Sequence, residues 1–221
     1  MTFSSVITAL LLVLFIISSA VVLILNSRFI YHLDIKLLNL PEQVGMSEAD
    51  ILENYDRLIE YNSVLYDGEL ELPDFPMSDS GRIYFYEVKQ IFSVFQIMLV
   101  CTLVLGALFM IIRLKKGDPS FFKLGGIITL TLPLALGLLI AIGWDSVFVA
   151  FHKLFFNNDY WMFSAATDPV ITILPDTFFM HCALLILLII LLSGILMLLL
   201  YSRLRWNLGK KYKSKYILKL K

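Results

Sequence analysis

Residues 182–200 read CALLILLIILLSGILMLLL, a run without a single charged side chain. About 20 helical residues cross the hydrocarbon core of a bilayer, so this run has the length and composition of a transmembrane helix. A basic segment follows it directly, with eight Lys and Arg residues between positions 203 and 221. Because Lys and Arg concentrate in cytoplasmic loops, the pattern predicts a spanning helix whose C-terminal end lies in the cytoplasm.

Three further apolar runs are long enough to span a membrane. The chain is 59% hydrophobic and only 16% charged, with a mean hydropathy of +0.82, which is typical of membrane proteins. The first run has no Lys or Arg before it and no small-residue cleavage site behind it, so we expect a retained anchor. The four expected spans cover about Val6–Leu25, Phe92–Ile112, Leu124–Ile142 and Cys182–Leu200.

The distribution of basic residues also predicts the orientation of the chain. Residues 113–123, RLKKGDPSFFK, contain four Lys or Arg residues between the second and third spans. This loop and the C-terminal segment are therefore expected in the cytoplasm. We expect an all-α membrane protein with four transmembrane helices and both termini cytoplasmic. Two structured extracytoplasmic segments, about 27–90 and 144–180, carry amphipathic helices in this prediction.

The expected domain organisation has two parts. Residues 1–205 form a four-helix transmembrane domain that includes the two outer segments. Residues 206–221 form a basic cytoplasmic tail, which either determines topology alone or also holds anionic lipid headgroups. Cys101 and Cys182 lie in apolar runs without metal-ligand spacing, which is typical of small buried apolar residues.

The first outer segment contains two helical patterns. In MSEADILENYDRLIEYN, residues 46–62, Ser47 precedes Asp50 by three positions, a relative of the capping box. Apolar residues then recur at helical spacing, so we expect an amphipathic helix on the other helices or on the membrane surface. In MSDSGRIYFYEVKQIF, residues 77–92, Ser78 or Ser80 is expected to cap a helix that continues into the second span.

The second outer segment contains a histidine among aromatic residues. If SVFVAFHKLFF, residues 146–156, is helical, His152 lies in one stripe with Phe148, Phe151 and Phe155. This spacing favours an interfacial packing residue, but it leaves open a role for His152 as a base. A loop with Asn and Asp residues follows, and its aromatic residues fit a belt at the membrane interface: Trp144, Tyr160 and Trp161.

The inventory of reactive residues restricts the chemistry. The histidines at 32, 152 and 181 are scattered without a metal-binding motif, and no phosphate loop or GxSxG elbow is present. The spans carry almost no ionisable residues, unlike those of transporters, and nothing beyond the basic tail suggests nucleic-acid binding. An imidazole has a pKa of about 6.5, so His152 is the natural general base. Tyr84, with a phenol pKa near 10, suits a hydrogen-bond donor to an oxyanion.

Two parts of the second outer segment resemble a known family. The stretches FHKLFFNNDYWMF, residues 151–163, and DPVITILPDTFF, residues 168–179, resemble the second-loop signature of the bacterial lipoprotein intramolecular transacylases, Lit. The resemblance implies an enzyme of the cytoplasmic membrane that acts at the extracytoplasmic face, without metal or cofactor. Its substrate is a diacylglyceryl-modified lipoprotein, and its other partners are membrane lipids. The sn-2 acyl chain moves to the α-amino group of the lipoprotein's own N-terminal cysteine, leaving the lyso form.

The resemblance also implies a site. The family is expected to use two histidines, of which His152 matches the second, whereas Tyr84 in YFYEVK stands where the first is expected. His152 and Tyr84 are therefore the expected catalytic residues. The alternative is a catalytically impaired member that binds lipoprotein or lipid at the outer leaflet. The expected substrate-binding or orienting residues are Arg82, Glu87, Lys89, Asp159, Trp161 and Asp168, with Asp159 or Asp168 orienting the imidazole.

Overall fold

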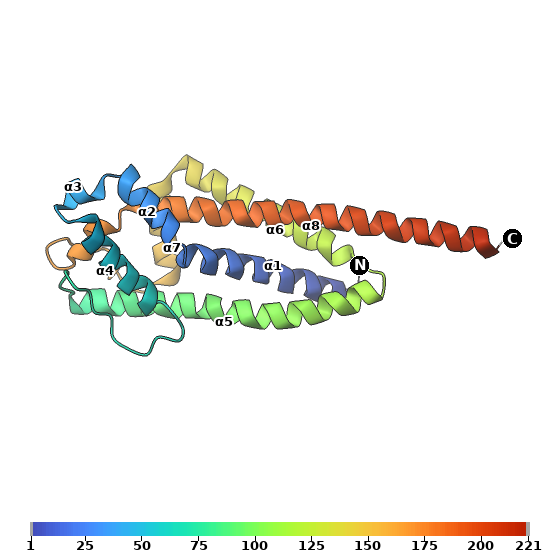
Figure 1. Cartoon of the computed structure of the whole chain (residues 1–221), viewed down its shortest axis with the longest axis horizontal. Helices are drawn as coiled ribbons and strands as arrows, with labels where there is room; N and C mark the ends of the chain where they lie inside the picture. The colour runs from blue at the N-terminus through green and yellow to red at the C-terminus, as the bar shows by residue number, and fades with distance from the viewer. Residues whose placement is uncertain (1, 220–221) are drawn as a thin grey trace. The chain divides into compact units, whose positions relative to one another are not determined.

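The computed structural model describes residues 2–219, with side chains for residues 2–210, and over this range the chain contains no strand. The all-α class predicted from the sequence is therefore confirmed for the described residues (Figure 1). The helices are α1 (Phe3–Leu25), α2 (Arg28–Leu37), α3 (Leu40–Val44), α4 (Glu48–Tyr61), α5 (Asp79–Lys115), α6 (Ser120–Ile142), α7 (Trp144–Phe155), the 3-10 helix η1 (Pro169–Ile173) and α8 (Asp176–Lys219).

Within the described range, four helices are long and apolar enough to cross a membrane: α1, α5, α6 and α8. Each of the four predicted spans lies inside one of them, so the predicted number and order of spans are confirmed. The helix boundaries extend beyond the apolar runs, since α5 begins at Asp79 and α8 continues to Lys219. The extensions contain no Pro, so no residue in them removes a helical hydrogen bond.

Helix caps predicted from the sequence are present at the starts of α4 and α5, the two helices expected in the first outer segment. The Ser47 hydroxyl accepts a hydrogen bond from the Asp50 backbone N–H at 3.2 Å, which fixes the start of α4. The Ser78 hydroxyl accepts one from the Gly81 N–H at 3.0 Å, so Ser78 rather than Ser80 caps α5. The expected helix at 146–156 is present as α7, two residues earlier at its start.

The chain forms two compact units, and the long helices contribute residues to both. The span unit comprises Met1–Ala20, Met98–Gly137 and Leu187–Lys221. The pocket unit comprises Val21–Ile97 and Leu138–Ile186, and both predicted outer segments fall within it. The predicted division into residues 1–205 and a basic tail stays a prediction, because the side chains of 211–221 lie outside the described residues.

In the span unit, α6 packs against α8 through small residues. A Cβ on Gly194 would lie 2.7 Å from Thr129 Oγ1 and 3.2 Å from the Gly126 carbonyl oxygen, and one on Gly126 would lie 2.8 Å from Leu198. The Thr129 hydroxyl donates to the Gly125 carbonyl at 2.8 Å, so its polar atom is satisfied within the seam. Small residues of this kind allow helix backbones to approach closely where the hydrophobic effect gives little drive, as in lipid.

An ion pair joins the beginning of α1 to the turn between α5 and α6. The Arg113 guanidinium, 6% exposed, pairs with Asp118 and donates to the Ser4 hydroxyl at 2.9 Å. Ser5 donates to the same carboxylate at 2.7 Å. Arg113 was expected to be one of the basic residues that determine orientation, and the structure shows that it also holds these segments of the span unit together.

Aromatic packing organises the pocket unit, in which α2, α3 and α4 follow one another (Figure 1). The rings of Tyr31 on α2 and Tyr55 on α4 stack with centroids 3.7 Å apart, and Phe178 on α8 meets both edge-on. The Tyr31 hydroxyl donates to the Ile173 carbonyl at 2.6 Å, which joins α2 to η1. This cluster fixes the helices that surround the candidate site.

Candidate functional site

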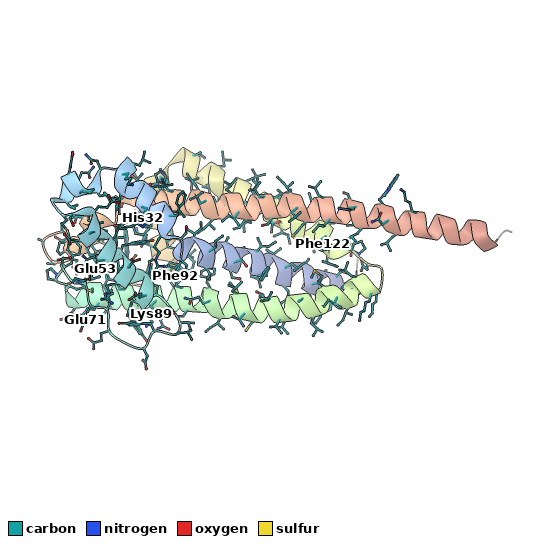
Figure 2. The ribbon with its side chains drawn as sticks, in the orientation of Figure 1. His32, Glu53, Glu71, Lys89, Phe92 and Phe122 are labelled. Carbon is teal, nitrogen blue, oxygen red and sulfur yellow. The ribbon has the colours of Figure 1, made fainter. Side chains whose placement is uncertain are left out.

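The pocket unit contains a cavity of about 170 Å³ with a mostly apolar wall. Its wall is built from the end of α1, from α4, α5, α7 and α8, and from the segment around η1. Figure 2 labels Phe92, a wall residue on α5, and the wall also includes Leu25, Leu58, Phe148, Ile171 and Phe178. A concave apolar site with a few polar groups is the usual form of a small-molecule or lipid site.

His152 lies in the wall of this cavity, 5% exposed, and its partners fix its tautomer. Its Nδ1 lies 2.8 Å from the Phe148 carbonyl oxygen, one turn earlier on α7. A carbonyl only accepts hydrogen bonds, so Nδ1 carries the proton and Nε2 is the unprotonated, basic nitrogen. Phe151, by contrast, is 48% exposed. His152 and Phe151 therefore do not share one face of α7 as expected. They are neighbours in the sequence, and neighbouring positions of a helix point about 100° apart.

The environment of His152 keeps the imidazole neutral. Burial lowers the pKa of His152 below its usual value, because the charged form loses hydration. The bond to the Phe148 carbonyl and the charge of Asp176 act in the opposite direction without reversing the shift. An imidazole that stays unprotonated at neutral pH can accept a proton from a substrate.

Tyr84 lies in the cavity wall with its hydroxyl directed at the basic nitrogen of His152. The Tyr84 oxygen is 3.4 Å from His152 Nε2, a long hydrogen bond in which the phenol donates. Its ring packs against Phe156 and Phe163, both at centroid distances of 5.1 Å. The two residues expected to be catalytic are thus adjacent, with their polar atoms facing each other.

Trp161 also lies in the cavity wall and stacks on the imidazole. Its ring centroid is 4.7 Å from that of His152, with 26° between the planes. The indole Nε1 is withdrawn from solvent and has no hydrogen-bond partner among the described residues. An unpaired buried polar atom costs about 1–3 kcal/mol, so such atoms are rare in native structures.

Asn62 contributes a second unpaired polar atom to the wall. Its Nδ2 donates to the Leu58 carbonyl at 2.8 Å, which fixes the amide orientation. Its Oδ1 is buried and has no partner within residues 2–210. Gln96 on α5 holds the neighbouring backbone by donating to the Asn62 carbonyl at 2.8 Å. The sequence did not single out Asn62, because a residue at the C-terminal end of α4 looks like an ordinary helix cap.

Two of the expected binding residues connect α5 to loops of the pocket unit. Both carboxylate oxygens of Glu87 accept from Asn158 Nδ2, at 3.0 and 3.1 Å, which fixes the loop after α7. Lys89, labelled in Figure 2, lies over the rings of Tyr61 and Tyr66 at 4.4 and 5.0 Å and donates to the Tyr66 carbonyl at 2.8 Å. The charged groups of Glu87 and Lys89 thus both have partners within the protein, without a substrate.

The expectation that Asp168 orients the imidazole is corrected by its hydrogen bonds. Its carboxylate accepts from the Ser78 N–H at 2.8 Å, from the Ser78 hydroxyl at 2.7 Å and from the Thr167 hydroxyl at 2.8 Å. Asp168 therefore fixes the start of α5, and a Cβ on Gly81 would overlap its Oδ1. The imidazole is oriented by the Phe148 carbonyl instead. Arg82 and Asp159, the remaining expected residues, have exposed side chains.

The other two histidines are separate from this arrangement. His181 Nδ1 lies 2.8 Å from the buried Asp34 carboxylate, whereas His32, labelled in Figure 2, is exposed on α2. Within the described side chains, no group of three or more His, Cys, Asp or Glu residues is placed to hold a metal ion. The cavity wall thus combines one neutral base, His152, with one phenol, Tyr84. Such a pair can take a proton from a substrate and donate a hydrogen bond.

Comparisons with known proteins agree with this chemistry. A family model described as lipoprotein intramolecular transacylase Lit matches residues 6–179. Among solved structures, the membrane-integral lipoprotein intramolecular transacylase Lit from Bacillus cereus is similar, with a TM-score of 0.91 and 39% identity over 94% of this chain and 96% of that chain.

Two further structures of the Bacillus cereus protein, in which one histidine is replaced, are also similar at 39% identity. The arginine variant has a TM-score of 0.83 and covers 96% of this chain and 93% of that chain. The alanine variant has a TM-score of 0.82, with 95% and 94% covered. No curated protein sequence matches the chain.

Proposed function

The chain belongs to the lipoprotein intramolecular transacylase (Lit) family, and we propose that it moves an acyl chain within a lipoprotein that carries a diacylglyceryl-cysteine at its N-terminus. The acyl chain leaves the sn-2 oxygen of the glyceryl group and joins the α-amino group of the same cysteine, which gives the lyso form. The observation that carries this proposal is the unprotonated Nε2 of His152 in the wall of an apolar cavity.

The proposed reaction forms one bond and breaks one. The amine nitrogen attacks the ester carbonyl carbon, and the electron pair of the carbonyl moves to its oxygen. His152 Nε2 takes the proton from the nitrogen and gives it to the sn-2 oxygen as the tetrahedral intermediate collapses. Donor and acceptor belong to one molecule, so correct positioning supplies much of the acceleration. Water is not consumed, and an apolar wall that excludes it suppresses hydrolysis of the ester.

Tyr84 is proposed to act as a proton partner of His152. Its hydroxyl is 3.4 Å from the nitrogen that exchanges the proton, so it can hold the imidazole in place before the substrate amine arrives. The resemblance to the family places a histidine at this position, and a phenol is a poor base at neutral pH. The second candidate function is therefore binding of lipoprotein or lipid without turnover, and the replacement at Tyr84 is the feature that favours it.

The proposal includes a place in the cell and a set of partners. Basic residues follow the second and fourth predicted spans, so we propose that both outer segments lie at the extracytoplasmic face of a bacterial cytoplasmic membrane. The acyl chains of the lipoprotein and of membrane lipids are then in reach of an apolar wall. The lipoprotein is the proposed substrate and the lipids are the solvent of the four spans.

Tandem mass spectrometry of a lipoprotein tests the proposal. The gene is expressed in a bacterium without this activity, and the N-terminal lipopeptide of one lipoprotein is compared with that of cells carrying the empty vector. We expect an N-acyl, S-monoacylglyceryl cysteine that disappears with His152→Ala. If folded protein in the membrane leaves only the diacylglyceryl form, transacylation is wrong for this chain and binding without turnover replaces it.

A further inference from the structure

A short apolar loop, residues 62–66, follows α4 and lies beside α5 (Figure 1). Gln96 on α5 holds this loop through both atoms of its side-chain amide. Its Oε1 accepts a hydrogen bond from the Val64 N–H at 3.1 Å, and its Nε2 donates to the Asn62 carbonyl at 2.8 Å. Gln96 belongs to the predicted span 92–112, so the loop reaches the level of the first turns of a transmembrane helix.

The two flanks of the 62–66 loop contact α5 nearer to the start of that helix. Lys89 lies over the rings of Tyr61 and Tyr66 and donates to the Tyr66 carbonyl at 2.8 Å. The step from Lys89 to Gln96 is about 10 Å along the axis of a helix that rises about 1.5 Å per residue. Tyr rings and a Lys ammonium are typical of the interface between membrane and water. The chain therefore leaves this interface after Tyr61, descends to Gln96 and returns at Tyr66.

The backbone of the 62–66 loop is paired as a membrane environment requires. Every backbone N–H from residue 62 to residue 66 donates a hydrogen bond within the described structure. The acceptors are the carbonyls of Leu58, Glu60 and Ser63, the Ser63 hydroxyl and Gln96 Oε1. Unpaired backbone groups are costly where water is scarce, and irregular backbone is excluded from lipid-exposed positions in the hydrocarbon core. The loop therefore suits the boundary between lipid headgroups and acyl chains.

The exposed side chains of the 62–66 loop are apolar. Leu65 is 89% exposed and Val64 40%, and the neighbours of Gln96 on α5 are similar, with Val94 61% and Ile97 54% exposed. A single exposed Leu is common in proteins, but Leu65 is held beside a helix that crosses the membrane. Exposed acidic residues follow where the chain has left this level: Asp67, Glu69 and Glu71.

We propose that the 62–66 loop inserts into the lipid leaflet beside the pocket unit, with Leu65 at the outer ends of the acyl chains, and that Gln96 holds it there. Its partner is the membrane lipid, and the Lys89 ammonium lies at the level of the headgroups. Asn62 belongs to the loop and also lines the cavity, so insertion brings the cavity wall to the level of the acyl chains. The inference goes beyond the proposed transacylase function and does not depend on turnover.

The experiment measures the depth of a nitroxide label in full-length protein in nanodiscs of phosphatidylcholine and phosphatidylglycerol. Every variant carries Cys101→Ala, because Cys101 is exposed, and the signal from the remaining Cys182 is recorded in the parent and subtracted. The label is attached at Leu65→Cys. The matched controls are Ile97→Cys for lipid and Glu71→Cys, at a position named in Figure 2, for water. Collisions with oxygen, which concentrates in lipid, are compared with collisions with a water-soluble nickel complex.

We expect the label at position 65 to lie below the lipid phosphates, by about 5–10 Å, with a ratio of oxygen to nickel collisions near that at position 97. Position 71 should show the ratio of a label in water. Insertion is wrong if the label at position 65 lies at or outside the level of the phosphates, or meets nickel as often as the label at position 71.

Gln96→Leu tests the anchor, because it removes both hydrogen bonds to the loop. Gln90→Leu is the matched control, since Gln90 is exposed on the same helix. We expect the label at position 65 to move outward by about 5 Å in Gln96→Leu and to keep its depth in Gln90→Leu. An unchanged depth in Gln96→Leu would show that Gln96 does not hold the loop. Absence of lyso product in wild type leaves the depth of the label as it is, so the two proposals fail separately.

Discussion

The α6–α8 seam of the span unit and the cavity wall of the pocket unit differ in whether their buried polar atoms have hydrogen-bond partners. In the seam, the Thr129 hydroxyl donates to the Gly125 carbonyl at 2.8 Å, and Gly126 and Gly194 leave no room for another atom. In the wall, the indole N–H of Trp161 and the amide oxygen of Asn62 lack partners among the described residues. The seam therefore satisfies its polar group within one helix, whereas two wall residues keep a buried polar atom without a partner in the described chain.

The largest effect is expected from His152→Ala. Removal of the base should lower kcat about 10³-fold, because no other wall residue titrates near neutrality. The thermal midpoint should also fall, because the buried imidazole packs against Phe148, Phe156 and Trp161, so turnover is compared at equal amounts of folded protein. Turnover of the lipopeptide, measured by mass spectrometry with purified variant, decides the question. Retained turnover would sink the proposed mechanism and leave the cavity as a binding site.

Gly194→Ala should damage the seam and leave the site intact. Its Cβ would lie 2.7 Å from Thr129 Oγ1, so the helices must separate, at a cost of about 1–3 kcal/mol in the free energy of unfolding. Gly137→Ala on α6 is the matched control, because its Cβ meets no atom of the described structure within 4 Å. Denaturant unfolding in detergent measures both. Equal stability of the two variants would contradict the close packing of the seam.

The environment of the base should be visible in the titration of His152 itself. Burial lowers the pKa of His152, so the neutral form persists below the usual value of about 6.5, and the ring signals of ¹³C-labelled His152 in an NMR titration should shift below that pH. The charge of Asp176 raises the pKa of His152, so Asp176→Asn should move the titration to still lower pH. A midpoint above about pH 6.5 would mean that the imidazole is more hydrated than its 5% exposure indicates.

The smallest effect is expected from Tyr84→His. An imidazole at this position can also donate to His152 Nε2, which lies 3.4 Å from the present hydroxyl, so turnover should stay within about threefold of wild type or rise. Tyr84→Phe, which removes the hydroxyl and keeps the ring packing, is the control. A large loss in Tyr84→His would show that the phenol has a specific role that the family's histidine cannot fill.

Local patterns predicted most of the fold. The four spans follow from uninterrupted apolar runs, and the starts of α4 and α5 follow from Ser47 and Ser78, because caps and periodicity act within a few residues. The predicted helix around His152 was correct, but its face was not fully predictable. Burial of His152 beside exposed Phe151 depends on which neighbouring helices cover α7.

Contacts between distant residues could not be predicted in the same way. Asp168 accepts a hydrogen bond from Ser78, ninety residues away. Lys89 lies over the rings of Tyr61 and Tyr66, and no spacing in the sequence indicates that these three residues meet. The missing partner of Asn62 is a property of the folded environment, so no residue pattern indicates it. The adjacency of Tyr84 and His152 was expected from the family resemblance rather than from periodicity.

Because Gly81 leaves space for the Asp168 carboxylate, the residue tolerated at position 81 depends on the residue at position 168. A side chain at 81 would displace the carboxylate that fixes the start of α5, whereas a shorter residue at 168 would leave that space empty. A lineage can therefore enlarge position 81 only after position 168 has shortened, and the intermediate is the less stable protein. The residue at position 81 and the residue at position 168 therefore have to be changed together for the start of α5 to stay fixed.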